Sequence, residues 1–240
     1  MVKTLVIVGP TASGKTGLAV EVAREIGGEV ISADSRAIYK GMDIGTAKPT
    51  VEEMGGVKHW GIDLVEPGER FTVADFKKYT LGCIADIKRR GKVPIIVGGT
   101  GLYVDAVIYG YQFSDVAKKT CSDRTEMDAG YVVVGIRWDK DVLRQRIRQR
   151  ADNIFEQDII GETERLAKRY GWGSQAMKSN IYPIVQEMTE GKITESEAKE
   201  LFELEDWHLA KRQMTWFARN KDIKWMGIDE LREYIYNIYK

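Results

Sequence analysis

Short, mostly apolar stretches alternate along the first half of the chain with longer stretches in which apolar residues recur at helical spacing. Nearly continuous apolar runs are typical of strands that a parallel sheet buries on both faces. The runs with this pattern are residues 2–8, 29–33, 93–97 and 131–136. Between them, residues 15–26 and 73–90 place their apolar positions on one helical face, the second after a Thr72 and Asp75 capping signature. This alternation predicts an α/β fold in which a parallel sheet is flanked by helices.

The C-terminal part of the chain has a different pattern. From Asp139 onward it is mostly helical, with a long segment over residues 195–220, a last short strand at about 223–225 and an amphipathic terminal helix. We therefore expect three parts: an α/β core, a mostly helical part that returns to the active site, and a C-terminal strand and helix packed on the core. Their predicted bounds are residues 1–150, 151–222 and 223–240.

Composition limits the classes of protein to which this chain can belong. With 43% apolar and 30% charged residues in a chain of 240, it can bury a core, which excludes a disordered or collagen-like protein. Lys and Arg balance Asp and Glu at 36 each, so the net charge does not by itself predict a polyanionic partner. Cys83 and Cys121, with two histidines, are too few for a disulfide framework or a zinc site. No apolar stretch reaches the roughly 18 residues of a membrane span, so we expect a cytoplasmic protein with no membrane partner.

The first predicted strand leads into a phosphate-binding loop. In this P-loop pattern, G-x-x-x-x-G-K-S/T between a strand and a helix, backbone N–H groups and the helix N-terminus bind phosphate oxygens. The lysine adds a positive charge, and the hydroxyl of Thr16 can ligate Mg²⁺. The residues of the loop are Gly9, Pro10, Thr11, Ala12, Ser13, Gly14, Lys15 and Thr16. The sequence therefore predicts a P-loop-type core that binds a diphosphate or a nucleotide.

Two further loops follow strands that should end at the same edge of the sheet. The segment DSRAIYKGMDIGTAKP begins with Asp34, whose carboxylate can act as a general base or as a partner of Mg²⁺. The segment VGGTGLY carries Thr100, whose hydroxyl can reach a phosphate or a leaving oxygen. A purely structural role remains open for each, as a loop-capping aspartate and as a tight glycine turn.

Together these motifs resemble the tRNA dimethylallyltransferase (tRNA isopentenyltransferase) family of the bacterial type. The resemblance rests on five blocks in the family's order: GPTASGKT, DSRAIYKGMDIGTAKP, KHWGIDLVEPGERFTVADF around His59, PIIVGGTGLY, and HLAKRQMTWFARN at residues 208–220. Unrelated P-loop enzymes share only the first block, so the combination is far more specific than any one part.

The resemblance implies transfer of a dimethylallyl group from dimethylallyl diphosphate to N6 of adenine 37 of tRNA, giving N6-isopentenyladenosine and pyrophosphate. It implies that Asp34 accepts the proton of the amine, that Arg212 stabilises the departing diphosphate, and that Thr100 orients the reacting groups. Mg²⁺ on Thr16 is the implied cofactor. Since the adenine has to leave its stack, tRNA contacts are expected at the pocket. By resemblance these are Asp34, Ser35, Arg36, Ala37 and Thr100.

The chain departs from the family pattern at two places. Ala37 stands where the family typically carries glutamine, and the helical insertion that helps to grip the anticodon stem is reduced to a short polar segment at about residues 111–130. Local charge still favours a polyanionic partner, because residues 137–150 hold six basic residues against two acidic ones, and four more basic residues lie within 209–221. We expect a monomer whose partners are dimethylallyl diphosphate and tRNA, bound through its anticodon stem-loop.

Three alternatives stay open. The missing insertion is compatible with prenylation of a free adenine nucleotide (AMP, ADP or ATP), and the phosphate loop alone would suit an ATP-binding P-loop nucleotide kinase or NTPase. Ala37 and the reduced insertion would also permit a non-catalytic RNA-binding relative. The AKRQ block weighs against nucleotide prenylation, and a kinase or NTPase leaves both this block and DSRAIYKGMDIGTAKP unexplained. The intact Lys15, Thr16, Asp34, Thr100 and Arg212 argue against a non-catalytic relative.

Overall fold

Six strands form one parallel sheet in the computed structural model, which describes residues 2–113, 126–179 and 181–240. Their order across the sheet is β3-β2-β4-β1-β5-β6. In chain order the strands are β1 (Thr4–Val8), β2 (Gly28–Ser32), β3 (His59–Trp60), β4 (Val93–Gly98), β5 (Tyr131–Ile136) and β6 (Lys224–Met226). Because β1 lies between β4 and β5, the loop that follows it opens near the middle of the carboxyl edge of the sheet.

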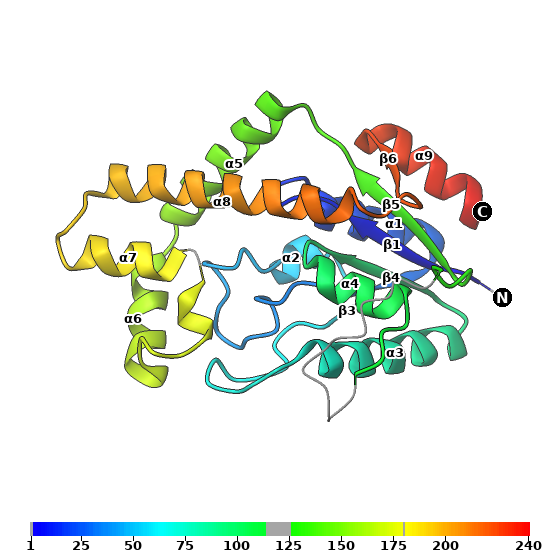
Figure 1. Cartoon of the computed structure of the whole chain (residues 1–240), viewed down its shortest axis with the longest axis horizontal. Helices are drawn as coiled ribbons and strands as arrows, with labels where there is room; N and C mark the ends of the chain where they lie inside the picture. The colour runs from blue at the N-terminus through cyan, green and yellow to red at the C-terminus, as the bar shows by residue number, and fades with distance from the viewer. Residues whose placement is uncertain (1, 114–125, 180) are drawn as a thin grey trace.

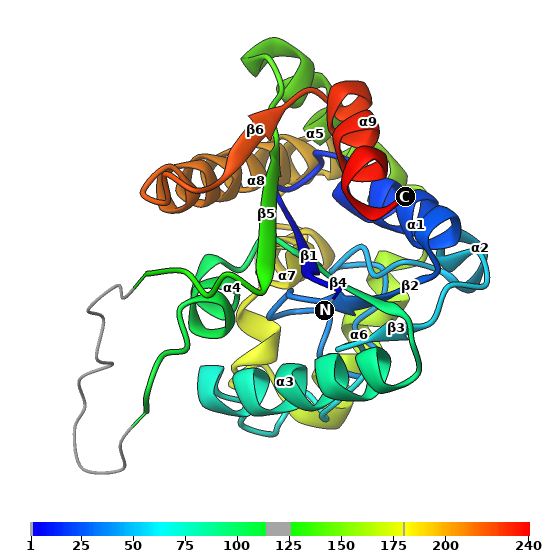
Figure 2. The same cartoon turned by 90° about the vertical axis from the view of Figure 1, so that its right-hand side faces the viewer.

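Helices cover both faces of this sheet (Figure 2). One face carries α1 (Lys15–Ile26) and α9 (Ile228–Tyr239), and the other carries α3 (Val73–Arg89) and α4 (Gly101–Ile108). Leu5 and Ile7 of β1 pack with the first pair, whereas Val6 and Val8 pack with the second. The strand is apolar throughout because both of its faces are buried, and the α/β fold expected from this pattern is confirmed.

A second group of helices lies beside the carboxyl edge of the sheet (Figure 1). Its members are α5 (Lys140–Phe155), α6 (Ile159–Tyr170), the 3-10 turn η1 (Ala176–Lys178), α7 (Ile181–Thr189) and α8 (Glu195–Phe217). These helices enclose an apolar core of their own with Ile38, Tyr39 and Met42 from the long loop after β2, a loop that leads to the one-turn helix α2 (Val51–Met54). From this group α8 runs back toward the sheet, where it contacts α4.

The apolar pattern does not predict β3, which consists of His59 and Trp60 alone at the edge of the sheet. Two residues show no periodicity, and side-chain contacts support this strand instead. Nε1 of Trp60 donates to the buried carboxylate of Glu29 at 2.9 Å, and Arg90 and Lys92 pair with the same carboxylate. The Arg90 hydrogen bond is the main reason why the pKa of Glu29 lies far below its ordinary value.

The ends of some predicted elements differ from the structure by a few residues. β6 begins at Lys224, one residue later than expected, and α8 ends at Phe217 because the chain turns before Asn220. The Thr72 capping box is present, and Cys83 is a buried core residue. Cys121 and residues 114–125 of the short segment expected at 111–130 lie outside the described residues. No described helix is both long enough and apolar enough to cross a membrane.

Candidate active site

The phosphate loop joins β1 to α1. It turns sharply because Gly14 adopts φ +81°, a left-handed conformation that favours glycine. Gly9 allows a close approach within the loop, since a Cβ there would lie 2.9 Å from Oγ of the fully buried Ser13. Nε1 of Trp138 donates to the carbonyl of Ser13 at 2.9 Å and ties the loop to the segment after β5. This contact fixes the loop, which leads directly into the N-terminus of α1, where an anion is favoured.

Lys15 begins α1, and its Nζ donates to the carbonyl of Pro10 at 2.9 Å. Desolvation lowers the pKa of Lys15 to about 8. Asp34 and Asp206 oppose this shift, while the guanidinium of Arg150 adds to it. A diphosphate beside the ammonium would favour its charged form and raise the pKa again, and its binding would then be coupled to protonation of Lys15.

Asp34 and Thr100 build the loop that faces this cradle. Asp34 follows β2, and its Oδ1 accepts the N–H of Arg36 at 2.7 Å and that of Ala37 at 3.4 Å. Thr100 follows β4, and its Oγ1 accepts the N–H of Ser35 at 3.0 Å and donates to the hydroxyl of Ser35 at 3.3 Å. One carboxylate oxygen of Asp34 thus shapes the turn, whereas Oδ2 has no hydrogen-bond partner within the described part of the chain.

A cavity of about 450 Å³ lies between these loops and α8. It brings together nearly all of the predicted site residues, which come from three strand ends and one distant helix. Those that line it are Thr11, Ala12, Ser13, Gly14, Lys15, Thr16, Asp34, Ser35, Arg36, Ala37, Thr100 and Arg212. Gly9 and Pro10 do not line the cavity but belong to the same loop. Arg212 extends from α8 with an exposed side chain.

Gln213 and Trp216 of α8 pack so closely on the segment after β4 that two positions there have room only for glycine. Oε1 of Gln213 accepts the backbone N–H of Thr11 at 2.7 Å, and its Nε2 lies so near Gly99 that a Cβ there would be 2.3 Å away. One turn later, Trp216 covers Gly101, where a Cβ would lie 2.1 Å from the indole ring. The Gly-Gly-Thr-Gly junction therefore has a packing function, because it lets α8 approach the phosphate loop.

Arg150 and Asp206 are charged residues of the cavity that no sequence motif assigns to the site. Asp206 of α8 is 2% exposed, and its Oδ2 lies 3.4 Å from Nη1 of Arg150 on α5. The hydroxyl of Thr11 joins the pair, donating to Asp206 at 3.3 Å and accepting from Arg150. Arg150 was visible in the sequence only as part of a basic stretch, and no local pattern marks Asp206, because their contact depends on how α5 and α8 pack.

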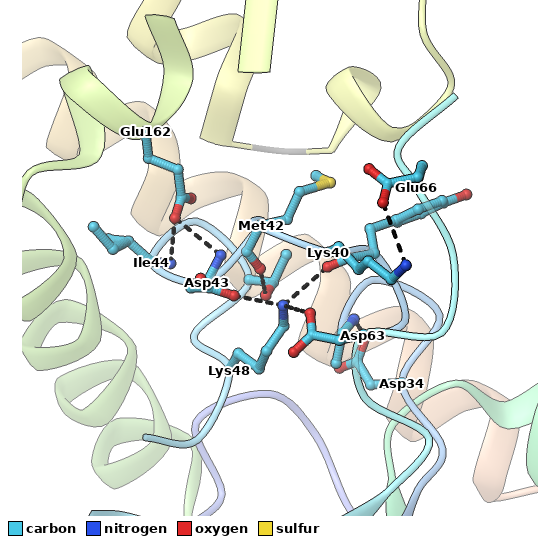
Figure 3. A network of polar contacts seen from close by, with 12 residues as sticks. Asp34, Lys40, Met42, Asp43, Ile44, Lys48, Asp63, Glu66 and Glu162 are labelled. Carbon is cyan, nitrogen blue, oxygen red and sulfur yellow. Dashed lines mark hydrogen bonds and ion pairs between the residues drawn. The ribbon is translucent and has the colours of Figure 1, made fainter. Parts of the chain in front are cut away.

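Lys48 is a further residue of the cavity that was not predicted from the sequence, although it belongs to the DIGTAKP block. Its Nζ donates to the carbonyl of Tyr39 at 2.9 Å and pairs with Asp43 at 2.5 Å and Asp63 at 2.6 Å (Figure 3). Only 5% of the side chain is exposed. The lysine thus stabilises the loop from inside, and its charge is already balanced by two carboxylates.

The oxygen donors of the cavity can be compared with the needs of Mg²⁺. Among the described residues, no cluster of three or more His, Cys, Asp or Glu side chains could hold a metal by itself. Mg²⁺ is often bound by one or two protein oxygens together with water and substrate phosphates. The hydroxyl of Thr16 and the carboxylate of Asp34 both line the cavity, so this donor set fits Mg²⁺ in company with a diphosphate.

A phosphate loop at the carboxyl edge of a parallel sheet, with a carboxylate at the next strand end, defines an α/β enzyme that acts on a phosphorylated substrate. Residues 2–64 match the Isopentenyl transferase family model, and residues 37–130 and 112–221 match the IPP transferase model. The chain is 35% identical to a tRNA dimethylallyltransferase of Acetivibrio thermocellus, over 96% of this chain and 93% of that relative. The chain therefore belongs to the IPP transferase family.

Solved structures agree with this assignment. A tRNA isopentenylpyrophosphate transferase from Bacillus halodurans superimposes with a TM-score of 0.89 at 32% identity, covering 100% of this chain and 97% of that one. A tRNA delta(2)-isopentenylpyrophosphate transferase from Staphylococcus epidermidis gives a TM-score of 0.86 at 31% identity, covering 99% and 98%. The alignment with the Acetivibrio relative spans 291 positions, more than the 240 residues of this chain. The relative therefore contains residues without a counterpart here.

Proposed function

We propose that this protein transfers the dimethylallyl group of dimethylallyl diphosphate to N6 of adenine 37 of tRNA, giving N6-isopentenyladenosine and pyrophosphate. The observation that carries the proposal is the single cavity that the phosphate loop, Asp34 and Arg212 share. Its volume of about 450 Å³ suits a small organic substrate. The names of the relatives, tRNA dimethylallyltransferase and tRNA isopentenylpyrophosphate transferase, support the same reaction.

The diphosphate of the donor would bind in the phosphate loop. There the loop N–H groups and the N-terminus of α1 favour an anion, and Lys15 adds its charge. As the allylic C–O bond breaks, negative charge grows on the departing pyrophosphate, and donors that are already in place stabilise it. We assign this role to Lys15 and to Arg212, whose exposed guanidinium reaches the cavity from α8.

Asp34 would act on the acceptor. The exocyclic amine of adenine attacks the allylic carbon, a new N6–C bond forms, and the amine then has to lose a proton. We assign the carboxylate of Asp34 as the base that takes this proton, with Oδ2 as the acceptor atom because Oδ1 already accepts two backbone N–H groups. Thr100 holds the same turn through Ser35, so we assign it an orienting role.

Mg²⁺ is the cofactor that we assign to Thr16, with Asp34 near it and the diphosphate oxygens completing the ligand set. When bound, it would neutralise charge on the diphosphate. The protein residues carry out the remaining tasks: the phosphate loop binds and orients the donor, and Asp34 takes the proton.

The tRNA would enter with its anticodon stem-loop, whose flipped adenine reaches the turn formed by residues 34–37. Exposed basic side chains on and near α5 and α8 supply positive charge for its phosphates. They are Arg137, Lys140, Arg144, Arg148, Lys211, Arg219 and Lys221. We propose that the protein acts as a monomer and that these residues bind the phosphates of the anticodon stem-loop.

The reaction can be tested with labelled dimethylallyl diphosphate and three acceptors: an anticodon stem-loop with adenine at position 37, the same stem-loop with guanine there, and AMP. Label on the adenine stem-loop alone is expected. Label on AMP alone would reassign the protein to nucleotide prenylation. No label on any acceptor would contradict the proposal, and ATP hydrolysis in a parallel assay would then indicate an NTPase.

A further inference from the structure

Glu162 is a buried carboxylate in the middle of the helical part, on α6, and it is 3% exposed. Its Oε2 accepts the backbone N–H of Asp43 at 2.9 Å and of Ile44 at 2.8 Å (Figure 3). Its Oε1 accepts the N–H of Gly45 at 2.9 Å and the hydroxyl of Tyr182 at 2.9 Å. All four donors converge on one side chain, so three consecutive amides of the loop after β2 depend on this carboxylate.

The same segment, residues 43–45, is also tightly packed. A Cβ on Gly45 would lie 2.7 Å from the ring and hydroxyl of Tyr182 and 2.8 Å from Ile181. Burial, with Glu162 beside it, raises the pKa of Tyr182 far above its ordinary value, so the hydroxyl stays a donor. On the other side of the loop, the buried ammonium of Lys48 pairs with Asp43. The segment is thus held between two charged groups.

This segment forms a wall of the active-site cavity. Residues 45–48 line the cavity together with the phosphate loop. The carbonyl of Thr46 accepts a long hydrogen bond, 3.5 Å, from Nη2 of Arg150, whose Nη1 contacts Thr11 of the phosphate loop. The position of the segment therefore influences where the Arg150 guanidinium lies relative to the phosphate cradle.

We propose that Glu162 is a positioning residue for donor binding: by holding the amides of residues 43–45, it sets the cavity wall at residues 45–48 and keeps Arg150 against the phosphate loop. Glu162 does not contact the cavity itself and acts only through the loop. The proposal rests on the proposed function insofar as the phosphate loop binds the diphosphate of the donor. An isolated buried carboxylate is costly unless its oxygens are hydrogen-bonded, and here three of the four compensating donors belong to the active-site loop.

The test compares Glu162→Gln with Glu164→Gln, the same chemical change at an exposed position of the same helix. Gln replaces one of the two carboxylate oxygens with an NH₂ group, which cannot accept a hydrogen bond. One or two loop N–H groups therefore lose their partner. Three measurements are made: the affinity for inorganic pyrophosphate by titration calorimetry, the KM for dimethylallyl diphosphate, and hydrogen exchange of the peptide that contains residues 42–48. Tyr182→Phe removes a single donor and keeps all three loop amides bonded to the carboxylate.

In Glu162→Gln we expect faster exchange within residues 42–48, pyrophosphate affinity lower by about tenfold, and a KM for the donor raised to a similar extent. Glu164→Gln should match the wild type, and Tyr182→Phe should change the affinity less than threefold or so. Unchanged pyrophosphate affinity in a Glu162→Gln protein whose loop exchanges faster would overturn the proposal, because Glu162 would then stabilise the loop without affecting the site.

Two safeguards keep this test decisive. If Glu162→Gln does not fold, Glu162→Asp takes its place. The Asp side chain keeps the negative charge but is shorter by one methylene group, so its carboxylate lies farther from the loop amides. The same three measurements are made, and the same results would support or overturn the proposal. Wild-type protein that binds pyrophosphate but transfers no label to any acceptor would contradict the proposed function, whereas the comparison of pyrophosphate affinities would still decide the role of Glu162.

Discussion

The side chain of Gln213 accepts the backbone N–H of Thr11 at 2.7 Å, although the two residues are 202 positions apart in the chain. This hydrogen bond joins the end of α8 to the phosphate loop. Thr11 is 4% exposed, so water cannot readily replace the lost acceptor if Gln213 is removed. We expect Gln213→Ala to lower kcat/KM for dimethylallyl diphosphate by about tenfold, the equivalent of about 1.4 kcal/mol.

Gln145→Ala is the matched control for this change, because Gln145 is exposed on α5 and should tolerate the substitution. Steady-state kinetics with varied donor and saturating stem-loop would measure the difference. Equal kcat/KM values for the two variants would contradict a role of Gln213 in holding the loop.

Asp34→Asn should lower kcat by about 10²-fold or more, because the amide cannot accept a proton from the adenine amine. The Asn side-chain oxygen can still accept the N–H groups of Arg36 and Ala37, so the turn should persist. Single-turnover transfer to the stem-loop measures the chemical step, and calorimetry with pyrophosphate tests the binding site. A variant that retains wild-type turnover would exclude Asp34 as the base.

The pKa of about 8 for Lys15 predicts a pH dependence of donor binding. Lys15 is charged below this pH and neutral above it, so kcat/KM for the donor should fall as the pH rises through about 8. Bound diphosphate raises the pKa, and the corresponding fall in kcat should therefore occur at higher pH. In Lys15→Ala the affinity for the donor should be lower, and the fall of kcat/KM with rising pH should be absent. A fall that persists in the variant would have to come from the titration of another group.

Gly101→Ala should weaken the contact between α4 and α8. The added Cβ would lie 2.1 Å from the ring of Trp216, whose Nε1 is held by the buried carboxylate of Asp105 at 2.8 Å. Such overpacking typically costs about 1–3 kcal/mol. We expect a lower midpoint of thermal unfolding and a higher KM for the donor, since α8 also carries Gln213. Gly82→Ala is a suitable control, because a Cβ at Gly82 on α3 meets no atom within 4 Å.

Much of the site could be predicted because its motifs are local. The phosphate loop, Asp34 and Thr100 each follow a strand, and parallel strands bring their carboxyl ends to one edge, so their meeting in one cavity follows from the predicted sheet. Arg212 was assigned to the site through the family resemblance alone. Arg150, Asp206 and Gln213 could not be found in this way, because nothing in their neighbouring residues indicates which side of α5 or α8 faces the loop.

The sequence by itself determined the alternation of strands and helices, the burial of β1 on both faces, the capping box at Thr72 and the phosphate cradle, because each depends on residues close together in the chain. The tertiary structure decided that β3 joins the sheet, that Lys48 pairs with Asp43 of its own loop and with Asp63 after β3, and that Glu162 holds the amides of residues 43–45. The partners of Trp60, Lys48 and Glu162 include residues of other segments, which approach only when the chain has folded. Their side chains carry no periodic pattern, and only the completed core brings them together.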